Sequence, residues 1–125
     1  MPNAETHEKI GLGILCLGVP CLVFKSDISS LYMFMISTEF WIGTYYVNPD
    51  LDTNSRCRKR WGCLKFIWKS FKHRGVLHNP YLWISIFFVA KELDLEIWVI
   101  GIVASSLIHI LTDMVGDKTR RIYQG

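Results

Sequence analysis

Carboxylates and histidines with metal-ligand spacing are the residues of this sequence most able to do chemistry. Asp50 and Asp52 lie one residue apart, where a long apolar run gives way to a basic segment. Carboxylates at the end of an apolar helix repel each other, so they must be hydrated, paired with cations or bound to a metal. His109 and Asp113 are four residues apart, so on a helix they project from one face and can bind one ion. This spacing predicts a metal site.

The predicted ligand set includes every histidine of the chain. Its members are His7, Asp50, Asp52, His73, His78, His109 and Asp113. Imidazole with carboxylate suits zinc first, with manganese or iron as alternatives, rather than calcium. A set larger than four also allows two ions.

Each of these residues also has a simpler interpretation. A single histidine at a helix start, such as His7, is more often a cap or a surface group. Asp50 and Asp52 could form turn and cap contacts after Pro49. Agreement of the whole set favours a shared metal site over these separate roles.

The composition predicts a single, largely apolar domain over residues 1–125. Half of the 125 residues are hydrophobic and 14% are aromatic, while the formal net charge is +3. Such a chain is apolar for a soluble protein yet more charged than a fully lipid-embedded one, which suggests membrane helices with a wet face. The four cysteines lack Cys-x-x-Cys spacing and are expected to be reduced thiols.

Four apolar runs predict an all-α protein, with helices over residues 7–24, 29–47, 81–90 and 95–115. Counted with their polar ends, the first, second and fourth reach the roughly 30 Å of a bilayer core. The third is too short to span unless it tilts or extends. Glu39 is the only charge of the second run and needs a partner if it is buried. The expected fold is therefore a four-helix membrane bundle.

The basic segment between the second and third runs predicts an amphipathic helix at the membrane surface. Residues 61–72 carry apolar and basic side chains on separate faces. The apolar face holds Trp61, Leu64, Trp68 and Phe71, and the basic face holds Lys65, Lys69 and Lys72. This separation favours contact with anionic lipid and makes nucleic acid an unlikely partner.

Lysine and arginine set the expected orientation in the membrane. Residues 49–80 hold eight of the fourteen, and only Lys25 and Lys91 fall on the opposite side of a bundle with four spans. By the positive-inside rule, residues 49–80 and both termini are cytoplasmic. All seven predicted ligands then lie at the cytoplasmic end of a multi-pass membrane protein.

Short motifs in a fixed order carry a resemblance to a known family. They are Thr6-His7, Asn48-Pro49-Asp50-Leu51-Asp52, Arg60-Trp61-Gly62, His73-Arg74 with His78, and His109-x-x-x-Asp113. On these residues the chain resembles a family of small membrane proteins known only as metal-binding, and it is similar to the wider group of membrane-bound metal-dependent hydrolases. It departs from the wider group in Asn79, where Ser or Gly is common, and in a short region between His78 and His109.

The resemblance implies metal binding more directly than hydrolysis. In a hydrolase, Asp50 or Asp52 could act as base and Arg74 would face the substrate. A guanidinium beside lysines suits a phosphate ester, and the membrane setting points to a phospholipid-like or lipid-linked phosphate. One alternative is a non-catalytic membrane protein with a structural metal or a basic face that recruits a partner; another is a soluble all-α metalloprotein.

Overall fold

The computed structural model describes residues 4–25, 29–52, 56–69 and 75–124; for residues 4, 19–20, 22–25, 52, 69 and 119–124 it describes the backbone alone. Its longer helices are α1 (Ala4–Lys25), α2 (Ser30–Tyr45), α5 (Pro80–Glu92) and α6 (Ile100–Gln124). Short helical segments join them: η1 (Pro49–Asp52), α3 (Arg56–Arg60), η2 (Gly62–Leu64), α4 (Lys65–Lys69), η3 (Val76–His78) and η4 (Glu96–Trp98). The described parts of the chain contain no β-strand, so the all-α prediction is confirmed.

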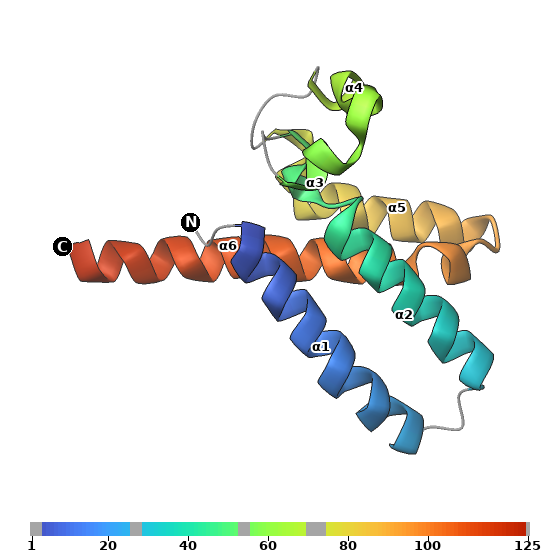
Figure 1. Ribbon diagram of the computed structural model, residues 1–125. Helices are drawn as coiled ribbons and strands as arrows, with labels where there is room; N and C mark the ends of the chain where they lie inside the picture. Colours follow the sequence, from blue (N-terminus) through green and yellow to red (C-terminus); the bar gives the residue numbers. More distant parts are fainter. Residues whose placement is uncertain (1–3, 26–28, 53–55, 70–74, 125) are drawn as a thin grey trace.

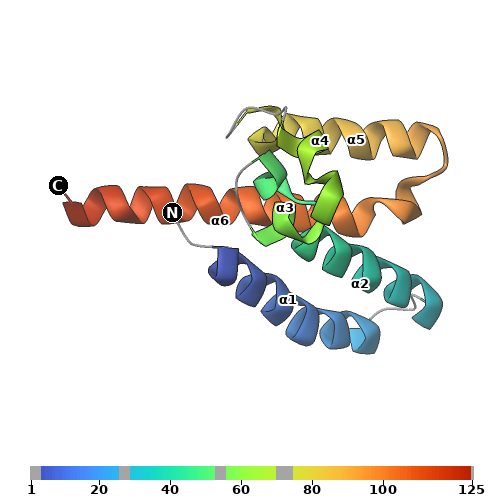
Figure 2. The same cartoon turned by 45° about the horizontal axis from the view of Figure 1, so that its top comes forward.

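Helix α6 is the element on which the others are assembled. Helices α1 and α2 form a hairpin, α2 crosses α6, and α5 lies along the first half of α6 (Figures 1 and 2). The small helices α3 and α4 lie over the end of α2, and the C-terminal half of α6 extends beyond its neighbours (Figure 1). The first half of α6 is therefore the part that can gather side chains from several elements.

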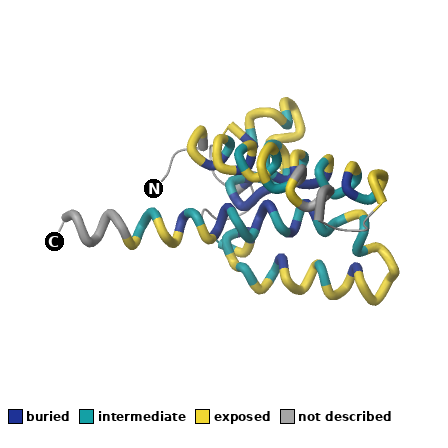
Figure 3. Tube along the Cα trace, turned by 90° about the horizontal axis from the view of Figure 1, so that it is seen from below, coloured by how far each residue is buried: buried dark blue, intermediate teal, exposed yellow. Residues whose placement is uncertain are grey.

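Buried side chains concentrate around this first half of α6 (Figure 3). Trp83 of α5 packs there with Val103 and Ile110 of α6. A second buried cluster joins η1, α3 and η3 and contains Leu51, Cys57 and Leu77. The two clusters fix the segments that flank the predicted ligands.

All four cysteines are free thiols, as expected. Burial raises the pKa of Cys57 to about 12, so this thiol stays protonated at neutral pH. It packs in the core beside Leu51 and Leu77.

The prediction of four membrane spans is not supported. In the described residues, one helix, Ile100–Lys118, has the length and hydropathy to cross a membrane. Helix α2 has 16 residues and α5 has 13, both shorter than the roughly 20 that a span needs. Ser29 caps the start of α2, and α5 stops before Asp94, whose φ of 57° breaks the helix. Capping and turn residues thus shorten the apolar runs.

The last helix also has different bounds from those expected. It begins at Ile100 because residues 96–98 form η4, and it continues through Gly116 to Gln124. The apolar run at residues 95–115 therefore marks neither end of the helix correctly.

The expected amphipathic helix over residues 61–72 is divided. Gly62 has a φ of +56°, which ends α3 and starts a separate 3₁₀ turn. Trp61 and Trp68 still turn inward and pack against the cluster around Leu51. Leu64 is exposed, contrary to the predicted face, and residues 70–72 lie outside the described part of the chain. The periodicity placed the two tryptophans correctly but missed the break.

Candidate metal centre

Five of the seven predicted ligands lie together where α1, η1, η3 and α6 meet. They are His7, Asp50, His78, His109 and Asp113. Asp52 follows in η1 with its side chain outside the description, and His73, like the neighbouring Arg74, lies outside the described residues. Residues more than a hundred positions apart in the chain are thus neighbours, as the sequence prediction required.

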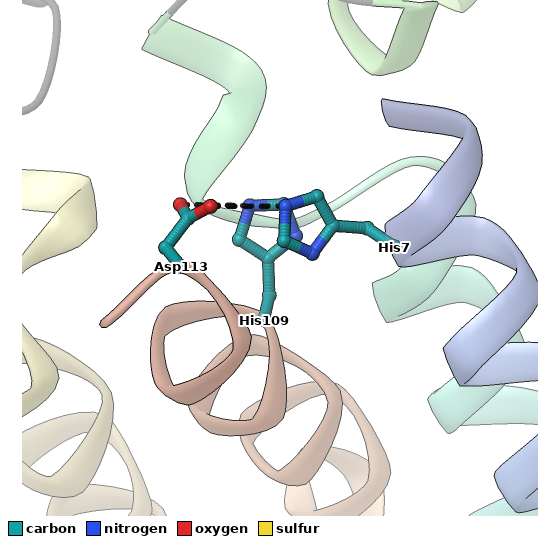
Figure 4. A group of neighbouring side chains, drawn as sticks. All are labelled: His7, His109 and Asp113. Carbon is teal, nitrogen blue, oxygen red and sulfur yellow. Dashed lines mark hydrogen bonds and ion pairs between the residues drawn. The ribbon is translucent and has the colours of Figure 1, made fainter. Parts of the chain in front are cut away.

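Two overlapping groups of possible ligand atoms share His109. His7, His109 and Asp113 form one group, and Asp50, His78 and His109 form the other, with the ligand atoms of each within 4.8 Å of one another. Figure 4 shows the first group, in which His7 reaches from α1 across the α6 residues. The rings of His7 and His109 stack with centroids 3.8 Å apart and an interplanar angle of 19°.

The two oxygens of Asp113 face different histidines. Asp113 Oδ1 accepts a hydrogen bond from His7 Nε2 at 3.0 Å. Asp113 Oδ2 lies 3.7 Å from both His78 Nε2 and His109 Nε2. Asp50 Oδ1 faces the same two nitrogens, at 3.8 Å from His78 and 3.4 Å from His109. Each of these two carboxylate oxygens therefore lies within 3.8 Å of both imidazole nitrogens.

Four of these spacings lie near those between the ligands of a tetrahedral ion. A tetrahedral zinc with bonds of roughly 2.0–2.2 Å places its ligands about 3.3–3.6 Å apart. The four separations of 3.4–3.8 Å between Asp50 or Asp113 and the two histidines lie close to that range. A direct hydrogen bond would be shorter, near 2.9 Å.

Buried polar atoms without partners support the same conclusion. His109 and Asp113 are only 6% and 7% exposed. Among the described residues, His109 Nε2, Asp113 Oδ2 and His7 Nδ1 have no hydrogen-bond partner. Native proteins rarely leave buried polar atoms unsatisfied, because each costs about 1–3 kcal/mol. A divalent ion would satisfy two of these atoms and neutralise the paired carboxylates, so the residues present fit a metal.

The histidines keep Asp50 ionised despite its burial. Burial alone would raise the pKa of Asp50, but the neighbouring His109 and the nearby charges of His7 and His78 lower it below its usual value. An ionised carboxylate is the form that binds metal. Asp50 is therefore ready to act as a ligand at neutral pH.

Asn48 is the residue that aims Asp50 at the histidines. Its Nδ2 donates to Thr44 O at 2.7 Å, which closes the end of α2. Its Oδ1 accepts from the backbone N–H of Asp50 at 3.0 Å, which forms a tight Asx-turn. Asn48 is buried, as are Pro49 and Leu51 on either side of Asp50. One interpretation of the sequence is a turn contact by Asp50 or Asp52 after Pro49. In the structure Asn48 makes the turn contact, and the Asp50 carboxylate lies among the histidines.

We expect Asn48→Ala to lower metal affinity by about 10–100-fold, the effect typical of residues that orient ligands. The substitution removes both hydrogen bonds that set the direction of Asp50. Ser29→Ala is the matched control, since it removes a cap at the opposite end of α2. Competition with a chromogenic chelator measures both affinities. Equal losses in the two variants would show that Asn48 acts only through general stability.

Arg60 and Trp61 tie α1 and α2 together above the site. Arg60 Nη2 lies 2.7 Å from a carboxylate oxygen of Glu8, and its Nη1 donates to Tyr45 O at 3.1 Å. Trp61 Nε1 donates to Tyr46 O at 2.8 Å. Glu8 directly follows His7, so these contacts hold the start of α1 in place. In the Arg60-Trp61-Gly62 motif, Arg60 and Trp61 thus hold α1 and the end of α2 in place.

Asn79 and Trp83 hold the segment that carries His78. Asn79 caps α5 by accepting from the backbone N–H of Tyr81 at 2.9 Å. Trp83 Nε1 donates to Leu77 O at 2.8 Å, which fastens η3 to α5. Asn79, a departure from the wider group's pattern, fits its position because it is a good helix N-cap.

A cavity of about 170 Å³ opens beside the ligands. It is lined by His78, Asp113 and Asp117 together with apolar residues of α6. Sequence reasoning missed Asp117, although its position four residues after Asp113 places both carboxylates on one helix face. The cavity gives this side of the cluster room for water or a small substrate group.

Comparisons with known proteins also point to metal binding. The model of a family described as uncharacterized metal-binding proteins (DUF2227) matches residues 2–86, which include His7, Asp50 and His78. An uncharacterized protein of Aquifex aeolicus (strain VF5) is 42% identical over 48 residues, or 34% of each chain. The aligned part of the chain thus spans about a third of that relative. No solved structure matches the chain.

Proposed function

The chain belongs to the DUF2227 family of uncharacterized metal-binding proteins, and we propose that it is a metal-dependent hydrolase. The ion would be held by Asp50, His78, His109 and Asp113, with zinc as the first choice and manganese or iron as alternatives. The His7 ring, hydrogen-bonded to Asp113, would orient that carboxylate.

The observation that favours catalysis is the cavity next to the ligands. A structural zinc site is closed by its four protein ligands, whereas a catalytic site leaves access for water and substrate. Here His78 and Asp113 line the cavity of about 170 Å³, so the centre has one accessible side. A divalent ion held there would act as a Lewis acid and would lower the pKa of a bound water towards neutrality.

The protein's own residues would then position the reactants. Asp117 lines the cavity one turn beyond Asp113 and is a candidate to accept a proton from water. Asp52 keeps its predicted role as an alternative base. Arg74 keeps its predicted role at the substrate, where a guanidinium would pair with two phosphate oxygens.

We also propose that the protein works at a membrane, with the site on the cytoplasmic face and a lipid-linked phosphate as substrate. Large apolar side chains on several helices support this: Leu17, Phe34 and Tyr81 are each at least 70% exposed. They belong to α1, α2 and α5, whose outer faces are largely exposed (Figure 3). Large apolar side chains left exposed on several helices are available to meet lipid or a partner. Solubility without detergent would contradict the proposal.

The hydrolase proposal predicts that metal-loaded protein cleaves an activated phosphate ester, such as bis-p-nitrophenyl phosphate. Cleavage should stop with a chelator and resume when zinc or manganese is restored. We expect Asp117→Asn to reduce turnover by about 10²–10⁴-fold, the contribution of a general base, while keeping the metal. Bound metal without cleavage of mono- or diesters would overturn the proposal.

A structural metal is the second candidate, and the origin of the ligands favours it. The four come from η1, η3 and α6, so one ion would link segments that are far apart in the chain. A structural ion would be needed for folding, so its removal would unfold the protein. A catalytic ion should be removable from a protein that keeps its helical content.

A further inference from the structure

A second cavity lies well away from the metal centre, between α2 and the start of α6. It has a volume of about 280 Å³ and is lined mainly by apolar side chains, among them Phe34, Ile42, Trp98 and Ile102. The lining also includes Glu39. Glu39 contacts Gly101, which precedes His109 by eight residues, or roughly 12 Å along α6. The cavity is therefore a separate site.

Glu39 is a buried carboxylate with one oxygen satisfied. It is 8% exposed. Its Oε2 accepts a hydrogen bond from the backbone N–H of Gly101 at 3.0 Å, at the N-terminus of α6. Its Oε1 has no hydrogen-bond partner among the described residues. The contact with Gly101 thus satisfies one of the two carboxylate oxygens of Glu39.

The surroundings leave the other oxygen uncompensated. The described residues that line the cavity include no lysine, arginine or histidine. The N-terminus of α6 provides only a partial positive charge near Gly101. Burial raises the pKa of Glu39, and its ionised form calls for a cation or a hydrogen-bond donor at the unpaired oxygen.

We propose that this cavity binds an amphiphilic cation, with an ammonium group against Glu39 Oε1 and an apolar chain along Phe34, Trp98 and Ile102. The ammonium supplies both the positive charge and the donors that Oε1 lacks. The indole of Trp98 adds a surface that attracts cations. At about 30 Å³ per water-sized heavy atom, the cavity holds roughly nine such atoms.

The test uses the purified full chain and three probes of equal chain length. These are hexylammonium, hexanol and hexanoate, each titrated while NMR signals of Trp98 and Gly101 are followed. We expect saturable binding of hexylammonium, at least tenfold weaker binding of hexanol and none of hexanoate. Hexanol binding as tightly as hexylammonium would overturn the proposal, because a neutral Glu39 in an apolar cavity would behave that way.

Two variants separate the charge from the cavity. In Glu39→Gln the amide oxygen can still accept from Gly101, and we expect hexylammonium affinity to fall at least tenfold with metal content unchanged. Ile102→Trp should fill the cavity and abolish binding while Glu39 remains. Unchanged affinity in either variant would overturn the proposal. Metal content reports on the other site, so failure here leaves the hydrolase proposal intact.

Discussion

His109→Ala should lower metal affinity by on the order of 100-fold or more, the largest effect we expect from one substitution at the site. His109 is shared by both ligand groups, and its Nε2 lies within 3.7 Å of both Asp50 and Asp113. Removing the imidazole takes away the residue that both groups use and the neighbour that Asp50 and Asp113 share. Chelator competition with zinc measures the loss.

Asp117→Asn is the matched control for His109→Ala. It removes a carboxylate from the same helix and the same cavity, but Asp117 belongs to neither ligand group. We expect its zinc affinity to stay within about threefold of the wild type. If His109→Ala binds zinc as tightly as this control, the assignment of His109 as the shared ligand is wrong.

Gly101→Ala should destabilise the fold by about 1–3 kcal/mol or more, the cost of overpacking a tight interface. A methyl group at residue 101 would stand 2.6 Å from the backbone nitrogen of Phe40 and 2.6 Å from the Cβ of Glu39. It would also meet the carbonyl oxygen of Ile36. Backbone atoms cannot move aside as side chains do, so α2 and α6 would separate. Denaturant unfolding measures the change.

Gly13→Ala is the matched control in α1. A Cβ at residue 13 would meet nothing within 4 Å, and helix residue 13 has ordinary backbone angles. The substitution should therefore stabilise the protein by about 0.4–1 kcal/mol. If both alanines shift stability in the same direction, the close contact between α2 and α6 is not the reason for glycine at residue 101.

The meeting of five of the seven candidate ligands could be anticipated because their spacing is local and their assembly follows from helix ends. The spacing of His109 and Asp113 fixes a shared helix face, and Pro49 requires the apolar helix to end before Asp50. The prediction that His7 lies near the other candidate ligands followed from placing both termini and residues 49–80 on the same side of the expected bundle. Five of the candidate ligands meet in the structure although the membrane spans behind that reasoning are not supported.

Helix bounds were less predictable because the hydropathy of a segment does not show which residues cap or break a helix. The apolar run to Val47 concealed the Asx-turn of Asn48, and the run before Leu95 concealed the break at Asp94. Gly62 likewise divided a segment whose periodicity suggested one helix. In each case a short polar or glycine residue overrode the apolar pattern.

Positioning contacts between distant residues were beyond the sequence. Glu8 and Arg60 carry no signal that they pair, and Glu39 gives no indication that its partner is the backbone of Gly101. Asp117 could have been found from its spacing to Asp113. Its relevance depends on the cavity, which only the packed helices reveal.

The most direct test of the central claim is the metal content of the purified wild-type protein beside Asp50→Asn, measured by elemental mass spectrometry. The account predicts stoichiometric zinc, manganese or iron in the wild type and its loss in the variant, because Asp50 supplies one of the four facing ligand atoms. No metal in the wild type after reconstitution, or equal metal in both proteins, would contradict it.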